Sequence, residues 1–174
     1  MMNRAVLLGC VLFAATPWPA AQAEVLSAAA GGFQLKHQVT SPLAPEAAYQ
    51  RFLAIGEWWS DAHTYSGRAA GLSIDARPGG CWCEQLASGG ALRHMTAIYL
   101  DPGKALRFEG GLGPLQPMGA SGVMTIAFKP AAAGQGTTVS LVYNVSGYAA
   151  EGLAGIAPAV DQVLAEQLAR FAAN

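Results

Sequence analysis

The sequence predicts an α+β fold in which an antiparallel sheet of about six to seven strands is covered by a long C-terminal helix, with two short helices after the first strand. Two observations lead to this prediction. Short alternating or apolar stretches, separated by Gly- and Pro-rich turns, fill residues 72–145 and are typical of an antiparallel meander. Beyond residue 150 the apolar residues recur at steps of three and four, the spacing of an amphipathic helix. Because the apolar face of such a sheet needs a cover, the helix is expected to pack on it.

The composition narrows the class of protein. The chain has 174 residues, of which 52% are hydrophobic and 12% charged, and its net charge is −1. So many apolar residues can form a core, which excludes a disordered chain. A near-neutral chain without a Lys/Arg run offers no surface for nucleic acid. Nothing in the sequence predicts an oligomeric state.

The N-terminal residues 1–23 are predicted to be a cleaved signal peptide. Arg4 gives a basic start, residues 5–15 are apolar, and Ala21-Gln22-Ala23 fits a cleavage site. The apolar stretch is shorter than the roughly 20 residues that span a bilayer. Cys10 lies too early for a lipoprotein signal, because almost no apolar stretch precedes it. We therefore expect a periplasmic or secreted protein whose mature chain has no transmembrane segment.

The mature chain is predicted to start with a flexible, Ala/Gly-rich lead-in over residues 24–32, followed by a single domain over residues 33–174. Residues 33–39 alternate as a half-buried strand does. Pro45 and Glu46 are suited to the first turn of a helix, and a second short helix or a turn follows at residues 57–61.

Six further strands and one long helix complete the prediction. The strands are expected at residues 72–76, 81–86, 92–100, 105–109, 122–129 and 137–145. The helix is marked by its apolar residues Leu153, Ile156, Val160, Val163, Leu164, Leu168 and Phe171.

Several short motifs, in this order, resemble those of a known superfamily. They are Ala44-Pro45-Glu46-Ala47-Ala48-Tyr49, Trp58-Trp59, Pro78-Gly79-Gly80, Asp101-Pro102 before Leu106-Arg107-Phe108, and Gly136-Thr137-Thr138-Val139. The whole mature chain is similar to START-like, or SRPBCC, helix-grip proteins, in particular to the branch of heat-shock ATPase activator-like and polyketide cyclase/dehydrase-like proteins. The resemblance implies a helix-grip fold, in which a curved antiparallel sheet surrounds the long C-terminal helix. It also implies a cavity between sheet and helix that binds a small molecule. It implies no catalytic residue, because the superfamily shares no single set.

The main functional hypothesis is therefore an exported protein that binds an apolar or amphipathic small molecule. Apolar side chains on the inner face would form the cavity wall. The predicted wall consists of Trp59, Trp82, Met95, Phe108, Met124, Phe128, Leu141, Tyr143 and Leu164. A larger aromatic residue at Met124 or Leu141 should then reduce ligand capacity more than stability.

An enzyme of the cyclase or lyase kind is the alternative hypothesis. It would use the same cavity, with His63, Tyr65 or Tyr143 as acid or base. Composition and periodicity do not distinguish this enzyme from a binding protein.

A thiol- or metal-handling protein is the second alternative. Cys81 and Cys83 are two positions apart, so they share one face of a strand. They fit two free thiols, a redox-active pair, or zinc or copper ligands together with His94. If Gly89-Gly90 formed a two-residue turn, His94 would lie on the face of both cysteines, with Trp82, Met95 and Tyr99 opposite. No cofactor is predicted apart from this candidate metal.

Overall fold

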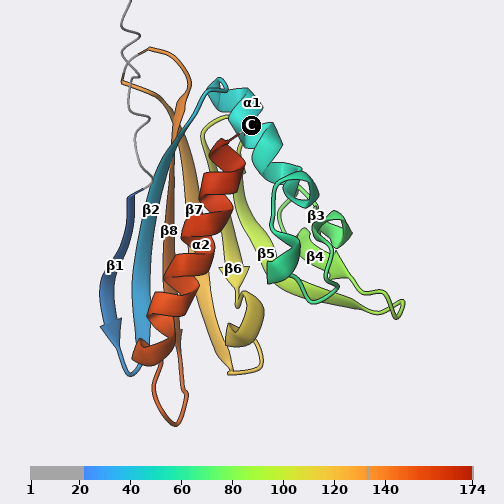
Figure 1. Cartoon of the computed structure of the whole chain (residues 1–174), viewed down its shortest axis with the longest axis vertical. Helices are drawn as coiled ribbons and strands as arrows, with labels where there is room; N and C mark the ends of the chain where they lie inside the picture. Colours follow the sequence, from blue (N-terminus) through green and yellow to red (C-terminus); the bar gives the residue numbers. More distant parts are fainter. Residues whose placement is uncertain (1–21, 133, 174) are drawn as a thin grey trace, which may run out of the picture.

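The computed structural model describes residues 22–132 and 134–173, and within them one antiparallel sheet dominates (Figure 1). Its eight strands lie in the order β1-β2-β8-β7-β6-β5-β4-β3. The strands are β1 (Gln22–Ala29), β2 (Gly32–Ser41), β3 (Leu72–Ile74), β4 (Cys81–Gln85), β5 (Ala91–Asp101), β6 (Ala105–Gly110), β7 (Ala120–Pro130) and β8 (Thr137–Gly147). The α+β prediction is confirmed.

Two α-helices and five short 3-10 turns complete the described part of the chain. The helices are α1 (Pro45–Leu53) and α2 (Ala157–Ala172). The turns are η1 (Ile55–Glu57), η2 (Asp61–His63), η3 (Ala69–Gly71), η4 (Gly113–Leu115) and η5 (Ala154–Ile156). The expected second short helix is thus a set of separate 3-10 turns. In the described part of the chain, no helix has the length and apolar character needed to cross a membrane.

The predicted flexible lead-in is wrong, because residues 22–29 form the edge strand β1. Its backbone pairs with β2, with Glu24 opposite Lys36 and Ala29 opposite Gly32. This strand is not evident from the sequence, because its residues do not alternate between apolar and polar. Most of its side chains from residue 24 onward are small and exposed. Residues 1–21 of the predicted signal peptide lie outside the described residues, and its predicted cleavage point, after Ala23, falls within β1.

Helix α2 crosses the inner face of the sheet (Figure 1) and packs mainly against β2 and β1. The side that faces the sheet buries Ala157, Leu164, Gln167, Leu168 and Phe171, as helical spacing requires. Near the C-terminus of the helix, α1 also packs on the sheet, at β7.

An aromatic cluster fills the space where α1 and the C-terminal end of α2 meet. Phe52 is at its centre, with ring-centroid distances of 5.3 Å to Trp58, 5.9 Å to Phe171 and 6.1 Å to Phe128. Trp82 extends the cluster at 6.4 Å from Phe52. Most of these rings meet edge to face, the favoured arrangement for buried aromatic pairs. This end of the molecule is therefore solidly packed.

Candidate functional site: an apolar cavity beside the N-terminal half of α2

A cavity of about 340 Å³ opens at the other end of α2. It lies between the N-terminal half of that helix, the strands β3 to β5, and the loops that carry η2 and η4. Its lining is mostly apolar and consists of Trp59, Ala62, His63, Thr64, Tyr65, Leu72, Trp82, His94, Leu112, Gly113, Pro114, Ile156, Ala159, Val160, Val163 and Leu164.

The helix wall of the cavity follows directly from sequence spacing. Five of the lining residues on and just before α2 are separated by three, one, three and one positions, which places them on one stripe of a helix. They are Ile156, Ala159, Val160, Val163 and Leu164. The opposite wall contains Trp59 and Trp82, whose ring centroids lie 5.6 Å apart at an interplanar angle of 89°.

Polar contacts tie the loop before η2 to α2. The backbone N–H of Ser60 donates to Oε1 of Gln167 at 2.8 Å. The indole N–H of Trp59 donates to the carbonyl of His63 at 2.9 Å, and Nε2 of His63 lies 3.0 Å from Oε2 of Glu166. The hydrogen bond with His63 is the main reason why the pKa of Glu166 is lowered. One side of the cavity is thus joined to the helix by side-chain contacts.

Tyr143 anchors the loop that follows β6, on the other side of the cavity. Its hydroxyl donates to the carbonyl of Gly110 at 2.8 Å and accepts from the N–H of Leu112 at 3.4 Å. Burial raises the pKa of Tyr143 to about 12. The side chain is absent from the cavity lining, so the structure gives this predicted acid or base a different place, as an anchor of the loop. Tyr65, which does line the cavity, donates its hydroxyl to the carbonyl of Gly113 at 3.0 Å.

A bulge in β5 places His94 in the lining of the cavity. Gln85 pairs with Ala91, so residues 86–90 form the loop, and the two-residue turn considered for Gly89-Gly90 does not form. Cys83 pairs with Arg93 but Trp82 with Met95, and His94 is the extra residue between them. A bulge turns consecutive side chains to one face, and here both His94 and Met95 are buried.

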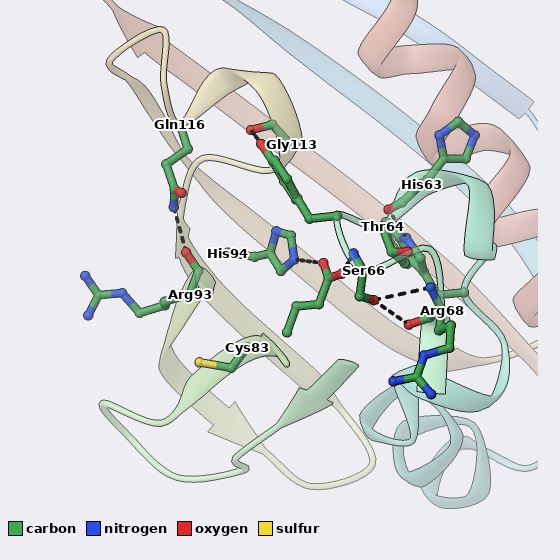
Figure 2. A network of polar contacts seen from close by, with 12 residues as sticks. His63, Thr64, Ser66, Arg68, Cys83, Arg93, His94, Gly113 and Gln116 are labelled. Atoms are coloured by element: carbon green, nitrogen blue, oxygen red, sulfur yellow. Dashed lines mark hydrogen bonds and ion pairs between the residues drawn. The ribbon is translucent and has the colours of Figure 1, made fainter. Parts of the chain in front are cut away.

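The candidate metal ligands Cys81, Cys83 and His94 therefore do not come together. Cys81 and Cys83 are half-buried on the face of β4 opposite Trp82, and a disulfide joins them across a Cα–Cα distance of 5.3 Å. In Figure 2 the Cys83 side chain points away from His94. Within residues 22–132 and 134–173 no three His, Cys, Asp or Glu side chains are grouped so as to hold a metal.

A second bulge in β5, near Ile98, turns the side chain of Tyr99 outward. Tyr99 therefore does not share the buried face of Trp82 and Met95, as the two-residue turn would have required.

His94 instead pairs with a buried carboxylate. Its Nε2 lies 2.9 Å from Oε2 of Glu84, whose side chain is fully buried (Figure 2). The backbone N–H of Ser66 donates to the other oxygen of Glu84. Burial acts to raise the pKa of Glu84, but the hydrogen bonds from Ser66 and His94 outweigh it and lower that pKa. Glu84 is therefore a carboxylate in the folded protein at neutral pH.

Of the nine predicted wall residues, three line the cavity: Trp59, Trp82 and Leu164. The other six are core residues outside it, namely Met95, Phe108, Met124, Phe128, Leu141 and Tyr143. For Phe128 the reason is that α1 packs on β7, as the 5.6 Å distance between the ring centroids of Tyr49 and Phe128 shows. Of the proposed acids and bases, His63 and Tyr65 do line the cavity.

The residue that sequence reasoning missed is Glu84. It alternates with Trp82 on β4, so it shares the inner face. A carboxylate on an otherwise apolar strand face signals a buried partner, because a lone buried charge is costly. The sequence therefore pointed to a buried partner for Glu84. A two-residue turn at Gly89-Gly90 would have placed His94 on the face opposite Glu84, so the pair was not recognised.

The chain was also compared with known proteins. No model of a protein family matches the sequence, and no curated protein matches it either. Solved structures do match. A Rhizobium leguminosarum protein is 19% identical, with a TM-score of 0.56 over 88% of this chain and 95% of its own.

Two further matches carry descriptive names. Ara h 8.0201 is 12% identical, with a TM-score of 0.55 over 81% of this chain and 95% of its own. The anthrahydroquino-gamma-pyrone synthase Txn09 is 22% identical, with a TM-score of 0.51 over 80% of this chain and 94% of its own. At these identities the likeness concerns the fold. The protein has a helix-grip fold, which is the fold that the resemblance drawn from the sequence implied.

Proposed function

We propose that this protein binds an apolar or amphipathic small molecule in the cavity beside α2. The observation that carries the proposal is the cavity itself, about 340 Å³ in volume and lined mainly by aliphatic and aromatic side chains. Ligand pockets typically have volumes of about 300–1,000 Å³ and combine apolar walls with a few polar groups. Binding would be driven by removing apolar ligand surface from water. The fold shared with a synthase of aromatic products is in keeping with such a ligand.

We further propose that the protein acts after export, in the periplasm or outside the cell. The predicted signal peptide supports this, as does the Cys81–Cys83 disulfide, because disulfides persist in oxidising compartments. The test is an intact-mass measurement on the exported fraction of cells that express the full chain. We expect a chain that begins at Glu24 and is lighter by two hydrogen atoms than the dithiol form. A full-length chain confined to the cytoplasm would contradict export.

The binding proposal is tested by titrating the purified protein with 2-methoxynaphthalene, a two-ring apolar probe, in a calorimeter. Val163→Phe should weaken binding at least about tenfold, because the new ring occupies the cavity. Ala169→Phe is the matched control, since Ala169 is exposed on the same helix and outside the lining. Equal affinities of the two variants would contradict binding at this site.

A further inference from the structure

We propose that Nδ1 of His94 is the polar recognition point of the cavity, and that the ligand donates a hydroxyl hydrogen bond to it from an otherwise apolar skeleton. This inference rests on the proposed function and narrows its ligand class. The preferred ligands would be phenols and enols, because a more acidic hydroxyl is a stronger donor. Glu84 is a positioning residue that acts through the imidazole.

The hydrogen bonds of Glu84 assign the proton on His94. A carboxylate only accepts hydrogen bonds, so the nitrogen that faces it, Nε2, carries a hydrogen. In a neutral imidazole the second nitrogen then has a free lone pair. The pairing with Glu84 thus fixes the orientation of the ring and, when the imidazole is neutral, leaves Nδ1 as an acceptor.

Nδ1 itself has no hydrogen-bond partner among the described residues, although the His94 side chain is only 7% exposed. A buried polar atom without a partner is costly, and such atoms are rare in folded proteins. In Figure 2 the free nitrogen of His94 is directed away from the hydrogen bond made by the other ring nitrogen. His94 belongs to the cavity lining, so a bound molecule that reaches this enclosed nitrogen can supply the missing donor.

Three other polar side chains of the lining have partners within the protein. His63 contacts Glu166, and the hydroxyl of Thr64 donates to the carbonyl of Asp61 at 2.8 Å. The hydroxyl of Tyr65 donates to the carbonyl of Gly113. Among the buried polar atoms of the described residues that have no hydrogen-bond partner, Nδ1 of His94 is the one that belongs to a residue of the lining.

The surroundings of His94 favour an aromatic or unsaturated skeleton. The Tyr65 ring lies with its centroid 6.1 Å from that of His94, and Trp59 and Trp82 form the adjoining wall. A planar ligand with its hydroxyl on Nδ1 would place its apolar part among these rings. Aromatic surfaces pack favourably in this way.

The test compares two probes that differ in a single donor: 2-naphthol, which has a hydroxyl, and 2-methoxynaphthalene, which has a methyl ether. In calorimetric titrations we expect wild-type protein to bind 2-naphthol about tenfold more tightly. His94→Leu should abolish that preference while 2-methoxynaphthalene still binds. His63→Leu, the matched histidine control in the same cavity, should change the affinity for both probes by the same factor.

A spectroscopic readout keeps the test independent of variant folding. In wild-type protein labelled with ¹⁵N-histidine, Nδ1 of His94 should give the signal of an unprotonated ring nitrogen. The signal should shift when 2-naphthol binds and stay in place with 2-methoxynaphthalene. Glu84→Gln should reduce the probe preference, and Glu84→Asp should restore part of it.

The outcomes separate this inference from the proposed function. If both probes bind wild-type protein with equal affinity, or if the ether binds more tightly, the cavity binds ligands but the role of His94 is overturned. If neither probe binds, the proposed function fails and this inference fails with it. A protonated Nδ1 signal in the free protein would also overturn the assignment.

Discussion

The two ends of α2 have the same pattern of apolar residues but different surroundings. At the C-terminal end Phe171 is fully buried, with its ring centroid 5.4 Å from that of Trp58 and 5.9 Å from that of Phe52. At the N-terminal end Val160 and Val163 are half-buried and border the cavity. The comparison teaches that helical spacing predicts which residues face the sheet, but the opposing elements decide whether they meet a core or a cavity.

The difference comes from what lies opposite the helix. At the C-terminal end α1 brings Phe52 into the gap, and Arg170 donates from Nε to the carbonyl of Trp58 at 3.0 Å. At the N-terminal end the loops that carry η2 and η4 span the gap, joined by the hydrogen bond of Tyr65. These loops contact each other through polar groups and leave the space behind them open.

The largest expected effect is on the packed end. Phe171→Ala should lower the free energy of unfolding by about 3–5 kcal/mol, because it leaves a cavity within an aromatic cluster. Val163→Ala should cost only about 1 kcal/mol, since that side chain already borders open space. Urea unfolding followed by tryptophan fluorescence measures both. Similar losses in the two variants would show that the N-terminal end is packed as densely as the C-terminal end.

A moderate effect is expected from enlarging a core side chain. Met124 is fully buried between its strand neighbours Phe108 and Tyr143. Met124→Phe should therefore lower stability by about 1–3 kcal/mol through overpacking, while the affinity of the folded protein for 2-methoxynaphthalene is unchanged. This reverses the expectation drawn from the sequence, in which Met124 belonged to the cavity wall.

Val163→Phe is the matched comparison for that variant. It should block the cavity with a smaller loss of stability than Met124→Phe. Thermal unfolding measures the stability of both variants, and calorimetric titration measures their affinity for 2-methoxynaphthalene. Loss of binding in Met124→Phe would show that Met124 borders the ligand cavity after all.

A smaller effect should follow from acidification, through a histidine beneath α2. His37 is 1% exposed, and its Nε2 lies 3.0 Å from Asp161 Oδ1 without the geometry of a hydrogen bond. Burial lowers the pKa of His37, although Asp161 acts to raise it. The unfolded chain therefore binds this proton first as the pH falls, and stability drops below about pH 6.5, the ordinary histidine pKa.

One such proton limits the slope to about 1.4 kcal/mol per pH unit. Urea unfolding between pH 8 and pH 5 measures it, and His37→Gln should flatten the curve in that range. The lowered pKa values of Glu84 and Glu166 act at lower pH, below the ordinary carboxyl value near 4.5. An unchanged slope in His37→Gln would assign the loss to another group.

The smallest effect is expected at the Cys81–Cys83 disulfide. It joins residues two positions apart, so it restricts the unfolded chain little. It also lies on the face of β4 that is directed away from the cavity. Cys81→Ser should cost about 1 kcal/mol or less and leave the affinity for 2-naphthol unchanged, as measured by thermal unfolding and titration. A lost probe preference would show that the outer face influences His94.

The prediction from sequence was most successful where a pattern repeats. The helix stripe from Leu153 to Phe171 and the alternation in β2, β7 and β8 are long enough to define the elements and their inner faces. It was wrong at β1, which pairs through its backbone and has few buried side chains. It left open the facing of side chains in the β4–β5 hairpin, where the loop is longer than a two-residue turn and His94 is an added residue.

The sequence by itself determined the order of the elements from β2 to α2, the packing of α2 on the sheet and the apolar character of α2, because these depend on periodicity and on turn residues close together in the chain. The tertiary structure alone decided which inner-face residues border open space, and that Glu84 and His94 form a buried pair. The physical reason is that both depend on contacts between distant segments: α1 fills one end of the sheet, and one bulge reverses the side on which His94 lies. A shift of one residue in a strand moves a side chain between core and solvent, and local spacing does not reveal it.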